Sequence, residues 1–212
     1  PMNQLIANWR PILNARQSYD RLNELLLEDD AYSKQMPLPA PKGQLDVTAL
    51  VGLPPGHDKP VLAGIEFALT PGQVLAVVGP SAAGKSSLVK LLLGIWRPLS
   101  GSVRLDSVEL ADWRHDEVGP LVGCVPQEIE FFEATVAENI ARLGDVDPDK
   151  VVQAATLIGM HESILAFPQG YDTLLGETGF ALSGGQRQRL AIARAIYGMT
   201  RYVVMDEPNS NL

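Results

Sequence analysis

The chain has 212 residues, of which 46% are hydrophobic, and a formal net charge of −8 at pH 7. This length and composition fit one large α/β domain, or a medium domain with an appendage. The acidic balance argues against nucleic acid as the main partner, and the single cysteine, Cys124, rules out an internal disulfide framework. Because no uninterrupted apolar run reaches the roughly 18–20 residues of a membrane helix, we expect that the chain does not itself cross a membrane.

The first 43 residues predict a helix followed by a stiff linker. Residues 3–28 contain no glycine and one proline, Pro11, and their apolar side chains recur at helical spacing. The stretch MPLPAPKG, residues 36–43, spaces its prolines like an extended linker. The helix in residues 1–35 either packs on its own domain or is a connector that arrives from another domain.

Residues 44–125 are predicted to be rich in strands. Apolar and β-branched segments occupy residues 45–51, 61–70, 74–78, 101–110 and 121–125. A turn-rich stretch separates the first two, so we expect β-hairpins at the start of this region. Residues 74–78 are expected to form a buried parallel strand, because the run is short and apolar throughout.

The loop after residue 78 has the spacing of a phosphate-binding P-loop, with Gly79, four residues, Gly84, Lys85 and Ser86. Glycines let backbone N–H groups surround an anion, Lys85 supplies a mobile positive charge, and the Ser86 hydroxyl suits Mg²⁺. The alternative is an ordinary turn between a strand and a helix at residues 87–95. The predicted nucleotide-binding residues are Gly79, Pro80, Ser81, Ala82, Ala83, Gly84, Lys85, Ser86 and Ser87.

A mostly helical insertion is predicted at about residues 128–183, with helical spacing at 136–142, 148–160 and 161–167. The sequence LSGGQ, residues 182–186, follows it. Ser183 is expected to cap a helix, with Gly184 and Gly185 as exposed backbone donors, which makes a second anion site. One nucleotide cannot easily occupy both sites, so the pattern suggests two copies that share nucleotides. A simply capped helix start is the alternative.

Two acids end the apolar run at residues 202–205. Ligands of open α/β sheets bind at the carboxyl ends of strands, so Asp206 is placed to hold the Mg²⁺ that Ser86 also contacts. Glu207 is placed to orient or deprotonate an attacking water. Gln127, just beyond residues 121–125, can reach the same metal and water. The alternatives are two acids that solvate a turn and a polar loop glutamine.

Together these motifs resemble the nucleotide-binding domain of ABC transporters. Residues 79–86 resemble the Walker A motif, Gln127 the Q-loop, residues 182–186 the family signature, and residues 202–206 with Glu207 the Walker B motif and catalytic glutamate. The resemblance implies an α/β fold in residues 44–212: a P-loop NTPase core with a RecA-like mixed sheet and helices, an antiparallel β subdomain and a helical subdomain.

The resemblance also implies ATP and Mg²⁺ as cofactors, with Glu207, Gln127 and Lys85 as catalytic residues and Ser86, Gln127 and Asp206 at the metal. Its functional unit is a head-to-tail homodimer, in which one copy closes over the ATP of the other and hydrolysis reopens the pair. The residues that act on the other copy's ATP are Ser183, Gly184, Gly185 and Gln186.

Within exporters, three segments are most similar to the type I secretion ATPases that export proteins such as proteases: residues 15–26, the entry loop that contains PPG (residues 54–56) and the ending EPNSNL. This implies a place at the cytoplasmic face of the bacterial inner membrane. The implied partners are the protein's own transmembrane domain, a periplasmic adaptor, an outer-membrane channel and a protein substrate. Residues 14–27 resemble the helix that leaves the last transmembrane segment, and Glu177 resembles the contact to the membrane domains.

Several positions depart from the family pattern. Ala82 stands where many relatives carry glycine, and residues 44–59 hold no aromatic to stack on adenine, which leaves His57 as a candidate. The D-loop aspartate would follow Leu212 and the switch histidine lies further on, so we expect a C-terminally truncated domain that is weak or inactive alone. The alternatives are a soluble ABC-type ATPase and a non-hydrolysing nucleotide-binding regulatory domain.

Overall fold

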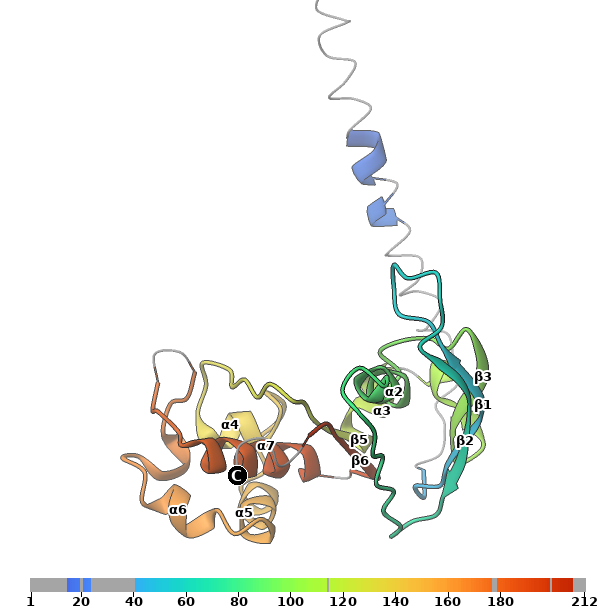
Figure 1. The fold of residues 1–212 in the computed structure, drawn as a ribbon. Helices are drawn as coiled ribbons and strands as arrows, with labels where there is room; N and C mark the ends of the chain where they lie inside the picture. Colours follow the sequence, from blue (N-terminus) through green and yellow to red (C-terminus); the bar gives the residue numbers. More distant parts are fainter. Residues whose placement is uncertain are drawn as a thin grey trace, which may run out of the picture. The chain divides into compact units, whose positions relative to one another are not determined.

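The computed structural model describes residues 15–19, 21–23, 41–113, 115–176, 179–198 and 200–207. The chain divides into two units, Pro1–Pro39 and Ala40–Leu212. In the first unit, residues 15–19 and 21–23 are helical and exposed (Figure 1). The rest of the helix predicted for residues 3–28, and residues 36–40 of the predicted linker, lie outside the described residues.

The first sheet of the second unit is antiparallel and has the strand order β2-β1-β3-β4. β1 lies inside it, with Leu45 paired to Leu69 on one side and to Leu105 on the other. Ala49, with a φ angle of 44°, lies where the pairing register of β1 shifts. The alternation of buried and exposed side chains along β1 therefore changes phase at this residue. The predicted hairpin-rich region is confirmed. The strands are β1 Leu45–Gly52, β2 Leu62–Leu69, β3 Ser100–Leu105 and β4 Val108–Glu109.

Asp106 fastens the start of this unit to the sheet. It lies with Ser107 in the two-residue turn between β3 and β4, where the φ angles of 49° and 74° suit a type I′ hairpin. Its carboxylate accepts hydrogen bonds from the backbone N–H groups of Lys42, Gly43 (3.1 Å) and Gln44 (3.0 Å). Partial burial raises the pKa of this carboxyl, but the three N–H groups outweigh it, so the pKa lies below its usual value.

We expect Asp106→Asn to lower the free energy of unfolding by about 1 kcal/mol at pH 7, because the amide keeps an acceptor oxygen but loses the charge. The folded-state pKa lies below the unfolded value, so this stabilisation is present above about pH 4 and is lost as the pH falls through the folded pKa. Denaturant unfolding of both proteins at pH 7 and pH 3 measures the difference in their free energies of unfolding. Asn suits the positive φ, and exposed Asp58→Asn is the control. A difference from wild type that persists undiminished at pH 3 contradicts the assignment.

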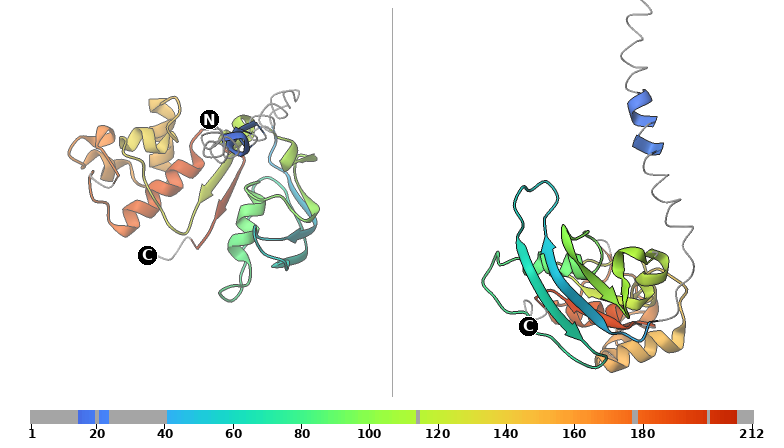
Figure 2. Two further views of the ribbon diagram at one scale, coloured as in Figure 1. Left: turned by 90° about the horizontal axis from the view of Figure 1, so that it is seen from above. Right: turned by 90° about the vertical axis from the view of Figure 1, so that its right-hand side faces the viewer.

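The second sheet is a parallel pair, β5 Val122–Val125 and β6 Tyr202–Met205. Val122 pairs with Tyr202 and Val125 with Met205, and Figure 2 shows the two arrows side by side and pointing the same way. Burial raises the pKa of the Cys124 thiol in this pair, as expected for an unreactive cysteine. Because the strands are parallel and in register, the residues that follow them lie at the same edge.

Helices also follow residue 128, where helical spacing predicted them. Figure 1 shows α4, α5 and α6 gathered around α7, and their apolar side chains form one buried cluster that includes Val136, Val151, Ile164 and Leu190. In the described part of the chain, no helix is long and apolar enough to span a membrane. The helices are α2 Lys85–Leu92, η1 Leu110–Asp112, α3 His115–Val118, η2 Gly119–Leu121, α4 Val136–Ile140, α5 Pro148–Leu157, α6 His161–Leu165, η3 Gly170–Asp172 and α7 Gly184–Ile196.

The buried parallel strand predicted for residues 74–78 was wrong. These residues form no strand, and the side chains of Val74 and Val78 are 94% and 90% exposed. The residues have strand propensity, but a strand also needs neighbouring backbone groups to pair with. Within the described residues, neither the four-stranded sheet nor the β5–β6 pair includes this segment, so its backbone has no strand partner.

Candidate functional site

The P-loop joins residues 74–78 to α2, and its glycine at position 84 is required twice. Gly84 is the N-cap of α2 and has a left-handed conformation, with φ 90°. A Cβ atom there would lie 2.9 Å from side-chain atoms of Val61 and Leu62. The loop therefore turns into the helix directly beneath the start of β2, and its N-cap residue provides no side-chain hydrogen bond to the first N–H groups of α2.

Ala82 shows how the loop accommodates a side chain where many relatives carry glycine. Its φ angle is 64°, in the left-handed region. An L-residue with a Cβ atom adopts this region at a cost of about 1 kcal/mol. Ala82 therefore holds the glycine-like backbone shape of the loop at a modest energetic cost.

Lys85 is folded over the loop. Its Nζ donates hydrogen bonds to the backbone carbonyls of Gly79 and Pro80, each 2.9 Å long. The ammonium charge thus lies where the backbone curves, and its hydrogen-bond acceptors among the described residues are two neutral carbonyl oxygens. An incoming phosphate oxygen is a stronger partner for this ammonium group than either carbonyl.

Gln127 and Glu207 meet at the carboxyl edge of the parallel pair. Gln127 Nε2 donates a hydrogen bond of 2.8 Å to Glu207 Oε2. Glu207 has a φ angle of 50°, a left-handed conformation that bends the chain directly after β6. Tyr202 at the start of β6 donates from its hydroxyl to the Leu92 carbonyl (2.7 Å), which ties this strand to the end of α2.

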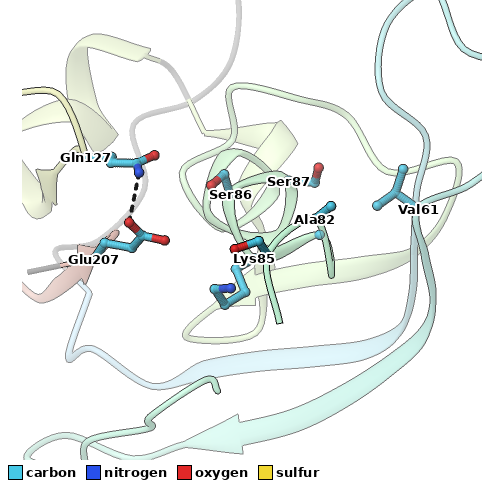
Figure 3. Close-up of a pocket in the computed structure, with 9 residues that line it drawn as sticks. Val61, Ala82, Lys85, Ser86, Ser87, Gln127 and Glu207 are labelled. Atoms are coloured by element: carbon cyan, nitrogen blue, oxygen red, sulfur yellow. Dashed lines mark hydrogen bonds between the residues drawn. The ribbon is translucent and has the colours of Figure 1, made fainter. Parts of the chain in front are cut away.

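Gln127, Glu207 and part of the P-loop line one pocket of about 340 Å³. Figure 3 shows Gln127 and Glu207 on one side of it and the P-loop residues Ser86, Ser87 and Ala82 across from them. A volume of this size lies within the range of small-molecule sites. The lining residues are Val61, Ser81, Ala82, Gly84, Lys85, Ser86, Ser87, Gln127 and Glu207.

Val61 is the lining residue that sequence reasoning missed. It lies just before β2 and faces the P-loop from the side opposite Gln127 (Figure 3). Nothing in a single sequence marks it, because its role comes from the packing of β2 against Gly84. His57, the candidate partner for adenine, is not among the residues that line this pocket.

Some predicted site residues lie outside the pocket lining. Gly79, Pro80 and Ala83 shape the P-loop without being part of the lining. Asp206 is half-buried at the end of β6, and its N–H donates to the Val125 carbonyl (2.9 Å). Its place beside Glu207 leaves it at the same sheet edge as Gln127, although it does not line the pocket.

The signature residues form a capped helix start, as predicted. The Ser183 hydroxyl accepts from the N–H of Gln186 (3.3 Å), and the Gln186 side chain accepts from the N–H of Ser183 (2.9 Å). This capping box begins α7. A Cβ atom built on Gly185 would meet nothing within 4 Å, so the glycine faces open space. None of the residues at positions 183–186 lines the pocket.

The donor set of the pocket fits a magnesium nucleotide. Lys85, the hydroxyls of Ser86 and Ser87 and the N-terminus of α2 suit phosphate oxygens. The Ser86 hydroxyl together with a carboxylate at the sheet edge suits Mg²⁺, which binds through few protein oxygens. The carboxylate of Glu207 lies beside these groups and accepts hydrogen bonds.

Comparison with known proteins agrees with these motifs. Residues 62–210 match the family model described as ABC transporter. The chain is 45% identical over 213 residues to the type I secretion system ATP-binding protein PrsD of Rhizobium meliloti, covering 100% of this chain and 37% of that relative. It is 37% identical over 214 residues to the ATP-dependent lipid A-core flippase of Saccharophagus degradans, covering 100% of this chain and 36% of the flippase.

A human relative, ATP-binding cassette sub-family B member 6, is 37% identical over 193 residues, which is 88% of this chain and 23% of the relative. The chain thus spans little more than a third of the length of the curated bacterial relatives described above. Both the family model and these identities extend across the P-loop, the signature and the paired acids. The chain therefore belongs to the ABC transporter family, as its motifs predicted.

Proposed function

We propose that this chain is the ATP-binding and ATP-hydrolysing motor domain of an ABC exporter of the type I protein secretion class. The observation that carries the proposal is the pocket in which the Gln127–Glu207 pair faces Lys85 and Ser86 across the P-loop. ATP hydrolysis requires a cation that binds phosphate, a hydroxyl that binds the metal ion and a carboxylate that acts as a base. Similarity to a type I secretion ATP-binding protein over the whole chain supports the subclass.

Residues 44–212 are proposed to be the ATPase domain, with an antiparallel β subdomain, a RecA-like core and a helical subdomain at about 128–183. Residues 1–35 are proposed as a connector from the last transmembrane segment, and 36–43 as a linker. The four-stranded sheet, the β5–β6 pair and the α4–α7 cluster support this division.

In the proposed reaction, Lys85 exchanges its contacts with the Gly79 and Pro80 carbonyls for phosphate oxygens. Bound Mg²⁺ supplies positive charge that offsets the charge of the phosphates, and Ser86, Gln127 and Asp206 are its proposed ligands. Glu207 accepts the proton of the attacking water while the water oxygen bonds to the γ-phosphorus and the bond to the β-phosphate oxygen breaks. Gln127 keeps the carboxylate of Glu207 turned towards the P-loop.

The proposed working unit is a head-to-tail homodimer at the cytoplasmic face of the inner membrane. Residues Ser183, Gly184, Gly185 and Gln186 of one copy close over the ATP bound by the other. Two observations support this: Gly185 faces open space, and it is not among the residues that line the copy's own pocket. The further proposed partners are the protein's own transmembrane domain, a periplasmic adaptor, an outer-membrane channel and an exported protein.

We expect Gly185→Glu to abolish ATP hydrolysis by the intact transporter while its ATP affinity stays within about twofold. A Cβ atom at Gly185 meets no described atom of its own copy within 4 Å, so we expect the added side chain to obstruct or repel a second copy or its ATP. Turnover assays and ATP-binding titrations measure the two effects. Gln153→Glu, which adds the same charge to an exposed position of α5, is the control. Wild-type turnover in Gly185→Glu would contradict the proposal that the signature residues act on the other copy's ATP.

A further inference from the structure

Arg142 lies just after the C-cap of α4, at a sharp bend of the chain. Arg142 and Leu143 both have φ angles of 59°, in the left-handed region that residues other than glycine rarely adopt. The bend is closed by a hydrogen bond of 2.9 Å from the Leu143 N–H to the Glu138 carbonyl. It leaves the Arg142 side chain half-buried rather than extended into solvent.

The guanidinium of Arg142 donates five hydrogen bonds, one for each of its N–H groups. The acceptors lie 20 to 58 residues away in the sequence and are all neutral carbonyl or hydroxyl oxygens. They are the carbonyls of Arg194 (2.8 Å), Gly119 (2.9 Å), Val122 (3.0 Å) and Ala195 (2.7 Å) and the hydroxyl of Thr200 (2.9 Å).

These acceptors belong to the bases of three elements. Two lie in the last turn of α7, Val122 begins β5 and Gly119 begins the short helix η2 directly before it, and Thr200 lies two residues before β6. Each element carries a residue of the proposed site at its other end. Ser183 caps the start of α7, Gln127 follows β5, and Glu207 follows β6.

Arginine suits this junction for two reasons. Its planar fork offers five N–H donors in a fixed geometry, whereas an ammonium group offers three from a single point, and its charge is favourable at the negative end of a helix such as α7. Since α7 has 13 residues, it is about 20 Å long. A tilt of about 5° around its base would move Ser183 by roughly 2 Å.

We infer that Arg142 is a positioning residue for ATP hydrolysis, which holds the bases of α7, β5 and β6 together so that Ser183, Gln127 and Glu207 keep their mutual geometry. The inference rests on the proposed function. Arg142 is not among the residues that line the pocket, so it acts on turnover and not on the binding of ATP to the P-loop. Errors of about 1 Å in the placement of reacting groups can lower rates roughly 100-fold.

The test compares kcat and the ATP dissociation constant of the intact transporter in wild type, Arg142→Ala and Arg142→Lys. We expect Arg142→Ala to lower kcat by about 10- to 100-fold and to leave ATP affinity within about twofold. Arg142→Lys should recover only a small part of kcat, because lysine keeps the charge without the fork. Arg104→Ala, at an exposed position of β3, is the matched arginine control and should keep wild-type kcat.

A second control separates positioning from general destabilisation. Val151 is 2% exposed in the core around α7, and Val151→Ala lowers thermal stability without touching the junction. Assayed where all variants are folded, Val151→Ala should keep kcat although its melting temperature falls. Wild-type kcat in Arg142→Ala, or a loss of kcat in both variants that follows their loss of stability, would overturn the inference alone. Absence of ATP hydrolysis in wild type would overturn both the inference and the proposed function.

Discussion

Glu207→Gln is expected to lower ATP turnover by about two to three orders of magnitude while ATP binding persists. The substitution keeps the size of the side chain and its hydrogen bond with Gln127, but an amide cannot take a proton from water. Positioned general bases contribute roughly 10²–10⁴-fold to rates, so the loss falls in this range. Steady-state phosphate release by the intact transporter measures turnover, and a nucleotide-binding titration measures affinity.

The control for this variant is Glu66→Gln, which makes the same change of charge at an exposed position of β2. It should behave like wild type. If Glu207→Gln turns over ATP at the wild-type rate, Glu207 is not the base and its pairing with Gln127 has another purpose.

Lys85→Ala is expected to weaken ATP binding by about 100-fold. Hydrogen bonds to charged groups contribute roughly 1.5–3 kcal/mol each, and a loss of about 2.7 kcal/mol corresponds to this change in the dissociation constant. The variant also loses the two contacts from Nζ to the Gly79 and Pro80 carbonyls, so the loop loses its internal brace. Titration with ATP and Mg²⁺ measures the effect.

Lys90→Ala is the matched control, since it removes the same charge from the same helix at an exposed position away from the pocket. Lys90 instead lies over the ring of Trp96, 4.7 Å from its centre. Equal ATP affinity in Lys85→Ala and wild type would contradict the assignment of the P-loop as the phosphate-binding site.

Local sequence signals predicted the helix starts well. Ser183 and Gln186 lie three residues apart, and their reciprocal hydrogen bonds need no distant partner. Helix ends were predicted less well. The helix expected at residues 148–160 stops at Leu157, and Gly159 has a φ angle of 67°, as left-handed residues at helix ends commonly do.

Contacts between distant parts of the chain could not be predicted. Gln127 and Glu207 are 80 residues apart, and their positions after two apolar strands, together with the family pattern, suggested a shared site but not the hydrogen bond between them. Val61 and Arg142 carry no motif, since the role of each comes from packing against residues that local spacing does not reveal. The strand expected at residues 74–78 failed for the same reason: its residue types suit a sheet, but pairing depends on the backbone beside it.

The exposed segment at residues 74–78 has a practical consequence for handling the protein. The run QVLAVV has no charge and no proline, and its valine side chains face solvent. Uncharged, β-branched segments with open backbone groups are templates for strand pairing between molecules. Aggregation of the expressed chain should therefore begin at this segment, and a lysine placed within it is the first change to make for solubility.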